Sequence, residues 1–160
     1  MPVPFESPAL LFVCLGNICR SPMAEGAFRA RLAAAGMRAH LDSAGTGGWH
    51  VGAPPDHRAC AVAARHGVDI SSLRARQVDQ PDFDRFTHIF ALDSDNLRTL
   101  ARMSPARARA ELRLLMDLVP GREGQAVADP YYGTSADFER SWAEVDAAAE
   151  AFVQRLSALR

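Results

Sequence analysis

The chain of 160 residues contains no lysine, only three cysteines and no long apolar run. All 18 basic residues are arginine, which we attribute to genomic base composition and from which no function follows. The formal net charge of -1 gives the average surface no electrostatic reason to bind nucleic acid or an anionic membrane. Any site for an anion must therefore be local.

The N-terminal stretch, MPVPFESPALLFVCLG, has no basic leader, and its apolar part is too short for a signal peptide or a membrane span. We therefore expect a cytoplasmic protein. Three cysteines without an export signal argue for a reactive or buried thiol and against a disulfide framework. With 48% hydrophobic and 23% charged residues, residues 1–160 are expected to form a single domain, and a monomer.

Apolar runs and helical periodicity alternate along the chain. Strands are predicted over residues 10–14, 39–43, 87–92 and 111–115, and helices over 22–36, 55–67, 94–103 and 135–159. The polar stretch 71–84 is expected to form turns, with room for one helical piece. This order predicts an α/β fold with a parallel sheet covered on both faces, in which ligands bind beyond the carboxyl ends of the strands.

The loop after the first predicted strand lies at that position. The strand ends at Cys14, and the next helix is predicted to begin with Ser21 as its N-cap and Pro22 at its first position. Loop N–H groups and the helix N-terminus then converge on one point, which is a site for an anion. Gly16 and Asn17 permit the tight, left-handed backbone that such a loop needs. In that field Cys14 is favoured as a thiolate nucleophile.

Arg20 stands at the far rim of the same loop, where its planar guanidinium can hold two oxygens of a transferring phosphoryl group. Ser21 can donate its hydroxyl to the thiolate, and its loss should slow the breakdown of a phosphoenzyme. By residue type alone, Cys14 would be a buried strand-end cysteine, and the loop reverses that preference. A zinc site on Cys14 and Cys19 fails because no second ligand pair lies nearby.

The stretch from Val13 to Glu25, VCLGNICRSPMAE, resembles the signature of the low-molecular-weight protein tyrosine phosphatases. The resemblance implies a three-layer, flavodoxin-like fold with a four-stranded parallel sheet flanked by helices. It also implies that the loop binds phosphate through its backbone; the residues concerned are Leu15, Gly16, Asn17, Ile18 and Cys19, with support from Ser21.

A phosphatase of this kind needs an acid to protonate the leaving phenoxide. Asp129 is the candidate, because the following Pro130 biases its backbone towards an extended conformation and fixes how the carboxylate is presented. The sequence DPYYG at 129–133 resembles the second motif of the family, in which the aspartate is the general acid. The substrate pocket is predicted to be walled by aromatic and apolar side chains, namely Leu15, Trp49, Tyr131 and Tyr132.

Two further segments resemble the family. Ser43 matches a serine that hydrogen-bonds the loop asparagine, here Asn17. Asp93 matches an aspartate that ties the end of the sheet to the loop backbone, and a simple acid at a helix N-terminus is the competing explanation. Family members often carry a histidine where this chain has Leu73, and we expect its absence to reduce activity modestly by loosening the loop.

The resemblance implies hydrolysis of phosphotyrosine in protein substrates, and of small aryl phosphates, through a phosphocysteine, with no metal or cofactor. Three alternatives remain. An arsenate reductase needs a further pair of cysteines to pass oxidation onward, and Cys60 is alone; an arginine phosphatase is disfavoured by Ile18 and the tyrosine pair. The third is a binding module without turnover. A protective Cys14–Cys19 disulfide and phosphorylation of Tyr131 and Tyr132 are separate hypotheses.

Overall fold

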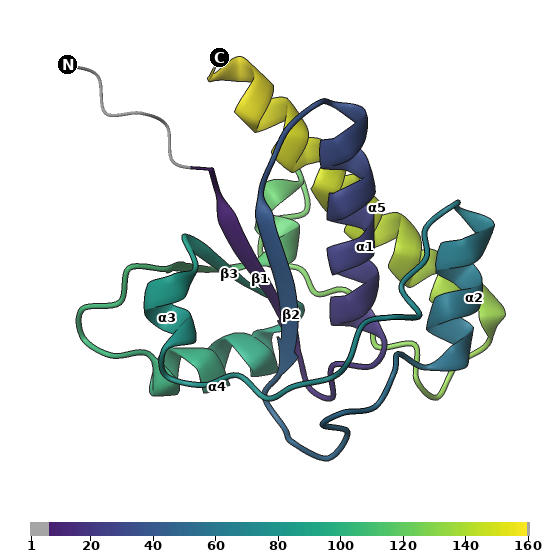
Figure 1. Cartoon of the computed structure of the whole chain (residues 1–160), viewed down its shortest axis with the longest axis horizontal. Helices are drawn as coiled ribbons and strands as arrows, with labels where there is room; N and C mark the ends of the chain where they lie inside the picture. The colour runs from purple at the N-terminus through teal and green to yellow at the C-terminus, as the bar shows by residue number, and fades with distance from the viewer. Residues whose placement is uncertain (1–6, 160) are drawn as a thin grey trace.

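The computed structural model describes residues 7–159 (Figure 1). The first six residues, on which the prediction of a missing leader partly depends, lie outside this range. The strands are β1 (Ala9–Cys14), β2 (His40–Gly45), β3 (His88–Ala91) and β4 (Glu111–Leu114). The helices are α1 (Arg20–Ala34), α2 (His57–Arg65), α3 (Asp82–Arg85), α4 (Ser94–Met103) and α5 (Ser135–Ala158), and the 3-10 helix η1 (Leu115–Leu118) follows β4.

The four strands form one parallel sheet in the order β2-β1-β3-β4. Strand β1 is central, and its Leu11 is in register with Asp42 of β2 and Ile89 of β3. Because the strands are parallel, their carboxyl ends meet at one edge of the sheet. The predicted α/β fold with a four-stranded parallel sheet flanked by helices is confirmed.

Side chains of β1 alternate between two apolar cores, one on each face of the sheet. Phe12 packs towards α1 and α5, with its ring 4.6 Å from that of Phe28. Val13 belongs to the second core, together with Phe83 of α3 and Leu100 of α4. Figure 1 shows these layers, with α1 and α5 on one side of the strands and α3 and α4 on the other. Burial on both faces explains the unbroken apolar run of β1.

One helix boundary differs from the prediction in a way that matters for the site. Helix α1 begins at Arg20, and Cys19 rather than Ser21 occupies the capping position, without a side-chain cap hydrogen bond. The prediction of Ser21 as N-cap is therefore wrong. Its hydroxyl makes other contacts, described below. Pro22 is the third residue of the helix and not the first as predicted, but it still lies within the first turn, where a missing N–H costs nothing.

Candidate active site

The loop between β1 and α1 is held from both sides by backbone hydrogen bonds. On one side, the amides of Thr46 and Gly47 donate to the carbonyls of Cys14 and Leu15, each at 2.9 Å. On the other, the N–H of Asp56 donates to Ile18 O at 2.8 Å. Asn17 has a φ of 58°, the left-handed conformation predicted for this turn. The loop therefore curls at the carboxyl edge of the sheet, at the N-terminus of α1.

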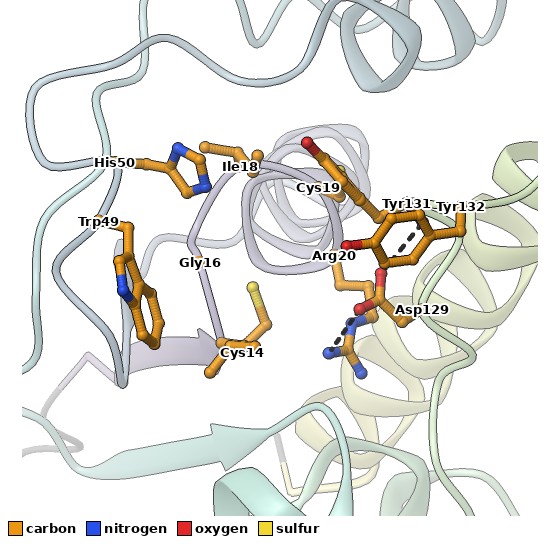
Figure 2. Close-up of a pocket in the computed structure, with 11 residues that line it drawn as sticks. Cys14, Gly16, Ile18, Cys19, Arg20, Trp49, His50, Asp129, Tyr131 and Tyr132 are labelled. Atoms are coloured by element: carbon orange, nitrogen blue, oxygen red, sulfur yellow. Dashed lines mark hydrogen bonds and ion pairs between the residues drawn. The ribbon is translucent and has the colours of Figure 1, made fainter.

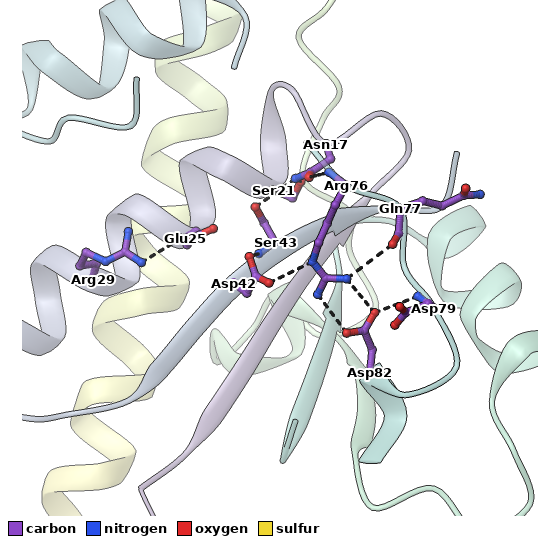
Figure 3. A network of polar contacts seen from close by, with 10 residues as sticks. All are labelled: Asn17, Ser21, Glu25, Arg29, Asp42, Ser43, Arg76, Gln77, Asp79 and Asp82. Carbon is purple, nitrogen blue, oxygen red and sulfur yellow. Dashed lines mark hydrogen bonds and ion pairs between the residues drawn. The ribbon is translucent and has the colours of Figure 1, made fainter. Parts of the chain in front are cut away.

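The side chain of Asn17 orients the hydroxyl group of Ser21. Figure 3 shows both side chains. Asn17 Oδ1 accepts the N–H of Arg76 at 3.0 Å, which leaves Nδ2 to donate to Ser21 Oγ at 2.7 Å and to Ser43 Oγ at 3.0 Å. Ser21 Oγ lies 3.0 Å from Cys14 Sγ. Because the oxygen of Ser21 already accepts from Asn17, its proton is free to donate to the sulfur.

The hydrogen bond expected between Asn17 and Ser43 is thus present. Leu73 is half-buried and packs against the core that contains Phe12. The Asn17 side chain donates to Ser21 and Ser43 and accepts from the backbone of Arg76, so residue 73 is not among its hydrogen-bond partners.

The guanidinium of Arg20 is buried at the base of the site, with 4% of its side chain exposed. Its Nη1 donates to Asp93 Oδ2 at 2.7 Å and to Val127 O at 3.0 Å, and its Nη2 lies 3.7 Å from Asp129 Oδ2. Burial opposes the charge, but the Cys14 sulfur and the two aspartates outweigh it, so the pKa of Arg20 is raised. Arg20 is therefore held as a fixed cation beside Cys14.

Asp93 differs in part from its predicted role. Its Oδ2 binds the Arg20 side chain, and its Oδ1 accepts the N–H of Asn96 at 2.8 Å as the N-cap of α4. The link to the loop backbone is therefore wrong, while the competing explanation, an acid at a helix N-terminus, is correct. The carboxylate joins the β3 end of the sheet to the loop through Arg20.

Asp129 reaches the site on a segment fixed by its flanking residues. The N–H of Val127 donates to Leu92 O at 2.8 Å, and Ser141 of α5 donates its hydroxyl to Ala128 O at 2.9 Å. Oδ1 of Asp129 accepts the N–H of Tyr131 at 3.1 Å, and about half of the carboxylate side chain is exposed. This geometry leaves Oδ2 directed towards Arg20 and open to a substrate.

These segments enclose a pocket of about 250 Å³. Its lining consists of Cys14, Leu15, Gly16, Ile18, Cys19, Arg20, Trp49, His50, Asp129, Tyr131 and Tyr132. Figure 2 shows the Cys14 sulfur between Trp49 on one side and Asp129 on the other. All four predicted wall residues line the pocket, and three segments far apart in sequence meet in it.

His50 also lines the pocket and was not predicted from the sequence. Its ring lies over Gly16, where an added Cβ would come within 3.1 Å of His50 Cδ2. The one available signal was its position beside Trp49 in a glycine-rich loop. Ser141 was also missed, because a serine inside a long helix gives no sign of the carbonyl that it contacts.

The other two cysteines have surroundings unlike those of Cys14. Burial raises the pKa of Cys19, and Asp56 and the Cys14 sulfur add to the rise, so Cys19 stays protonated at neutral pH. Cys60 is half-buried on α2, with its thiol 3.7 Å from Pro55 O. Within residues 7–159, no cluster of three or more His, Cys, Asp or Glu side chains could hold a metal ion. In the same range, no helix is long and apolar enough to cross a membrane.

Comparisons with known proteins identify relatives in both sequence and overall fold. A family model described as low molecular weight phosphotyrosine protein phosphatase matches residues 9–159. A low molecular weight protein-tyrosine-phosphatase of Streptomyces coelicolor is 49% identical over 143 residues, which cover 86% of each chain. The crystal structure of YfkJ from Bacillus subtilis has a TM-score of 0.89 at 35% identity, over 99% of each chain. That of a Drosophila arginine phosphatase has a TM-score of 0.87 at 30% identity, over 92% of this chain and 96% of its own. The chain therefore belongs to the low molecular weight phosphotyrosine protein phosphatase family.

Proposed function

We propose that this protein hydrolyses phosphotyrosine, and small aryl phosphates, through a phosphocysteine intermediate on Cys14. The observation that carries the proposal is one pocket of about 250 Å³ that holds the Cys14 sulfur, the buried Arg20 and Asp129. These are the three groups that the chemistry needs: a nucleophile, a cation for the phosphoryl oxygens and a proton donor.

In the first step, Cys14 Sγ attacks phosphorus, and the S–P bond forms as the P–O bond to the phenol breaks. Protonated Asp129 gives its proton to the leaving oxygen, so that a neutral phenol departs. Arg20 and the N–H groups of the loop hold the equatorial oxygens while negative charge shifts among them.

In the second step, Asp129, now a carboxylate, takes a proton from water, whose oxygen attacks the phosphorus of the phosphocysteine. A new P–O bond forms, the S–P bond breaks, and inorganic phosphate is released. Cys14 leaves as a thiolate and Asp129 regains its proton, which returns the site to its starting state. Ser21, whose hydroxyl is free to donate, stabilises the departing sulfur.

The aromatic and apolar lining of the pocket supports phosphotyrosine as the substrate. Leu15, Trp49 and Tyr131 can flank a phenyl ring whose phosphate reaches Cys14, and a shorter phosphoserine would leave this apolar wall uncovered. Phosphoarginine is a second candidate, because the Drosophila arginine phosphatase has the same fold. Ile18 in the loop and the tyrosine pair favour phosphotyrosine.

Several accompanying predictions belong to this proposal. Its partners would be proteins that carry phosphotyrosine, and neither nucleic acid nor a membrane. The protein would be a cytoplasmic monomer, and the chemistry would require neither metal nor cofactor. A reversible Cys14–Cys19 disulfide and phosphorylation of Tyr131 and Tyr132 remain hypotheses, and mass spectrometry after mild peroxide treatment would test the disulfide.

The experiment is hydrolysis of para-nitrophenyl phosphate without added metal, by wild type, Cys14→Ser and Asp129→Ala. Cys60→Ser, which removes a thiol outside the pocket, and Asp95→Ala, which removes an exposed carboxylate, are the matched controls. We expect no turnover by Cys14→Ser, slowing of about 100-fold or more by Asp129→Ala, and normal rates for both controls.

Phosphotyrosine, phosphoserine and phosphoarginine are then compared as substrates. Preference for phosphotyrosine supports the proposal, and preference for phosphoarginine replaces it with the second candidate. A reduced wild-type protein that binds phosphate but hydrolyses none of these compounds would show a binding module instead.

A further inference from the structure

Arg58 stands just outside the pocket, at the start of α2, and its guanidinium is fixed from one side. Nε and Nη2 donate to the two carboxylate oxygens of Asp56 at 3.0 and 3.1 Å. The backbone N–H of Arg58 donates to the same carboxylate at 2.8 Å, which caps the helix. Asp56 is largely buried, with 11% of its side chain exposed, so the guanidinium has little freedom to move.

The other side of the guanidinium faces two aromatic rings. Its central carbon lies 4.7 Å from the ring centroid of Phe138 and 5.5 Å from that of Tyr131. Phe138 is a fully buried residue of α5, whereas Tyr131 forms part of the pocket wall. Both distances are within the range of cation–π attraction. Arg58 therefore connects the rim of the pocket to the core.

The contact between Arg58 and Tyr131 links two hydrogen bonds made by residues that line the pocket. At one end, the N–H of Asp56 donates at 2.8 Å to Ile18 O in the loop between β1 and α1, residues 15–19, which we call the phosphate loop. At the other, the N–H of Tyr131 donates to Asp129 Oδ1 at 3.1 Å. The Arg58 side chain is the link between these two hydrogen bonds, and it connects the loop of the nucleophile to the segment of the acid.

A purely structural role in α2 is the competing explanation, and the chain offers a control for it. Arg65 lies near the other end of the same helix and pairs with Glu139 of α5 at 2.9 Å. Both arginines thus join α2 to α5, but of the contacts described for the two, only those of Arg58 include a ring that lines the pocket. Comparing the two separates an effect on the pocket from an effect on helix packing.

We propose that Arg58 is a positioning residue that holds the Tyr131 ring against the pocket, and thereby sets the affinity for the aromatic part of the substrate. The proposal rests on the assignment of the pocket as a site for aryl phosphates. Arg58 itself touches neither the phosphate loop nor the reacting atoms in this account. Its loss should weaken binding of the ring and leave binding of the phosphate group unchanged, because the hydrogen bond to Ile18 O comes from the backbone N–H of Asp56 and does not require the Arg58 side chain.

The test uses two probes, inorganic phosphate and phenylphosphonate, in which a phenyl ring takes the place of one phosphate hydroxyl, with dissociation constants measured by calorimetry at one pH. For Arg58→Ala we expect the dissociation constant of phenylphosphonate to rise about threefold or more, and that of inorganic phosphate to stay within twofold, on the strength of a cation–π contact. Arg58→Lys, which keeps the charge but not the planar fork, should show much of the same loss. Arg65→Ala should change neither constant.

A double-mutant cycle with Tyr131→Ala locates the effect. In the Tyr131→Ala background, Arg58→Ala should weaken phenylphosphonate binding no further, because the ring that it holds is gone. Equal weakening of both probes, full additivity in the cycle, or an equal effect of Arg65→Ala would overturn the proposal. Since both probes report binding, a wild-type protein that binds them without hydrolysing any ester would refute the proposed function alone.

Discussion

Asn17 combines two requirements that are usually met by different residues. Its backbone adopts a left-handed conformation with a φ of 58°, which asparagine tolerates better than most residues. Its amide has one acceptor bonded to Arg76 N–H and one NH₂ group bonded to two serine hydroxyls. A single side chain thus shapes the turn of the loop and directs the hydroxyl proton of Ser21 towards Cys14.

Ser21→Ala tests this arrangement. Removing the hydroxyl leaves the Cys14 thiolate without a charge-assisted hydrogen bond, which contributes about 1.5–3 kcal/mol. The step in which Cys14 leaves phosphorus should slow by about tenfold or more, and phosphoenzyme should accumulate, because sulfur departs as an anion. Burst kinetics with para-nitrophenyl phosphate measure this. Ser71→Ala, which removes an exposed hydroxyl, is the control; a Ser21→Ala variant with an unchanged steady-state rate and no burst would contradict the account.

Functional residues could be predicted from the sequence where a short motif contains them. They could not be predicted where their role depends on contacts with distant segments. Cys14, Arg20 and Asp129 were predicted from the composition of two short motifs, and they share one pocket. The contact of Asp93 with Arg20 was not predicted, because it depends on how the β3 end of the sheet meets a buried guanidinium 73 positions away. His50 was missed for the same kind of reason.

At the scale of secondary structure, the site depends on how closely the ends of β1 and β2 approach each other. Gly45 ends β2, and a Cβ added there would lie 2.8 Å from Leu15 O and 3.0 Å from Gly47 O. Both atoms belong to the backbone and cannot move aside as a flexible side chain would. Glycine is therefore required at this position by space, since the conflict is with the phosphate loop itself.

Gly45→Ala should displace the phosphate loop while the sheet stays formed. Overpacking of this kind costs about 1–3 kcal/mol, and if half of it falls on the loop, phosphate affinity drops by about two- to tenfold. Calorimetric titration with inorganic phosphate measures the loss, and far-ultraviolet circular dichroism checks that the fold is intact. Gly36→Ala, where the added atom has nothing within 4 Å and alanine is strained only by the φ of +68°, is the control for a glycine replacement away from the pocket. Unchanged phosphate affinity in Gly45→Ala would refute the spatial argument.

Strand β1 could be predicted from its unbroken apolar run, which is buried on both faces of the sheet, and the longer helices from apolar side chains at helical spacing. Helix α4 has the predicted bounds, and α5 ends one residue before its predicted end. The start of α1 could not be read from local signals, because Ser21 has the residue type of an N-cap but its hydroxyl is engaged by Asn17 and Cys14. The turn η1 follows β4 directly and was not predicted, because its apolar residues continue the pattern of the strand.

At the scale of the whole molecule, the half-buried Arg76 ties the loop between β1 and α1 to the β2 edge of the sheet and to α3 (Figure 3). Arg76 donates its N–H to Asn17, and its guanidinium binds Asp42 of β2 and the fully buried Asp82 of α3. Burial by itself raises the pKa of Asp82, but hydrogen bonds from Arg76 and from Asp79 N–H outweigh it, so the pKa lies below its ordinary 3.8. The ion pair should therefore stabilise the fold in a pH-dependent manner.

Because the pKa of Asp82 is lowered by folding, its contribution is complete well above pH 3.8 and is lost as the pH falls through the lower, folded value. Asp82→Asn removes one of the two carboxylates that pair with the half-buried Arg76, which should lower the free energy of unfolding at pH 7 by about 1.5–3 kcal/mol, the contribution of hydrogen bonds to a charged group. The variant should also lose less stability than wild type between pH 5 and pH 3. Urea unfolding at several pH values measures both effects, with exposed Asp95→Asn as the control. Parallel pH profiles for wild type and Asp82→Asn would contradict the argument.

The same unfolding curves bear on the prediction that residues 1–160 form one domain, since coincident transitions by fluorescence and circular dichroism are expected of a single cooperative unit. Sedimentation at several concentrations would test the predicted monomer.

The proposed function requires that the phosphoryl group be transferred to the Cys14 sulfur, and the most direct test is to trap this phosphocysteine. Wild type and Ser21→Ala are mixed with para-nitrophenyl phosphate, quenched within milliseconds in acid, digested and analysed by mass spectrometry. The account predicts one phosphoryl group on the peptide that contains Cys14, more of it in Ser21→Ala, and none in Cys14→Ser. Turnover by wild type with no phosphate on Cys14, or with phosphate on another residue, would contradict it.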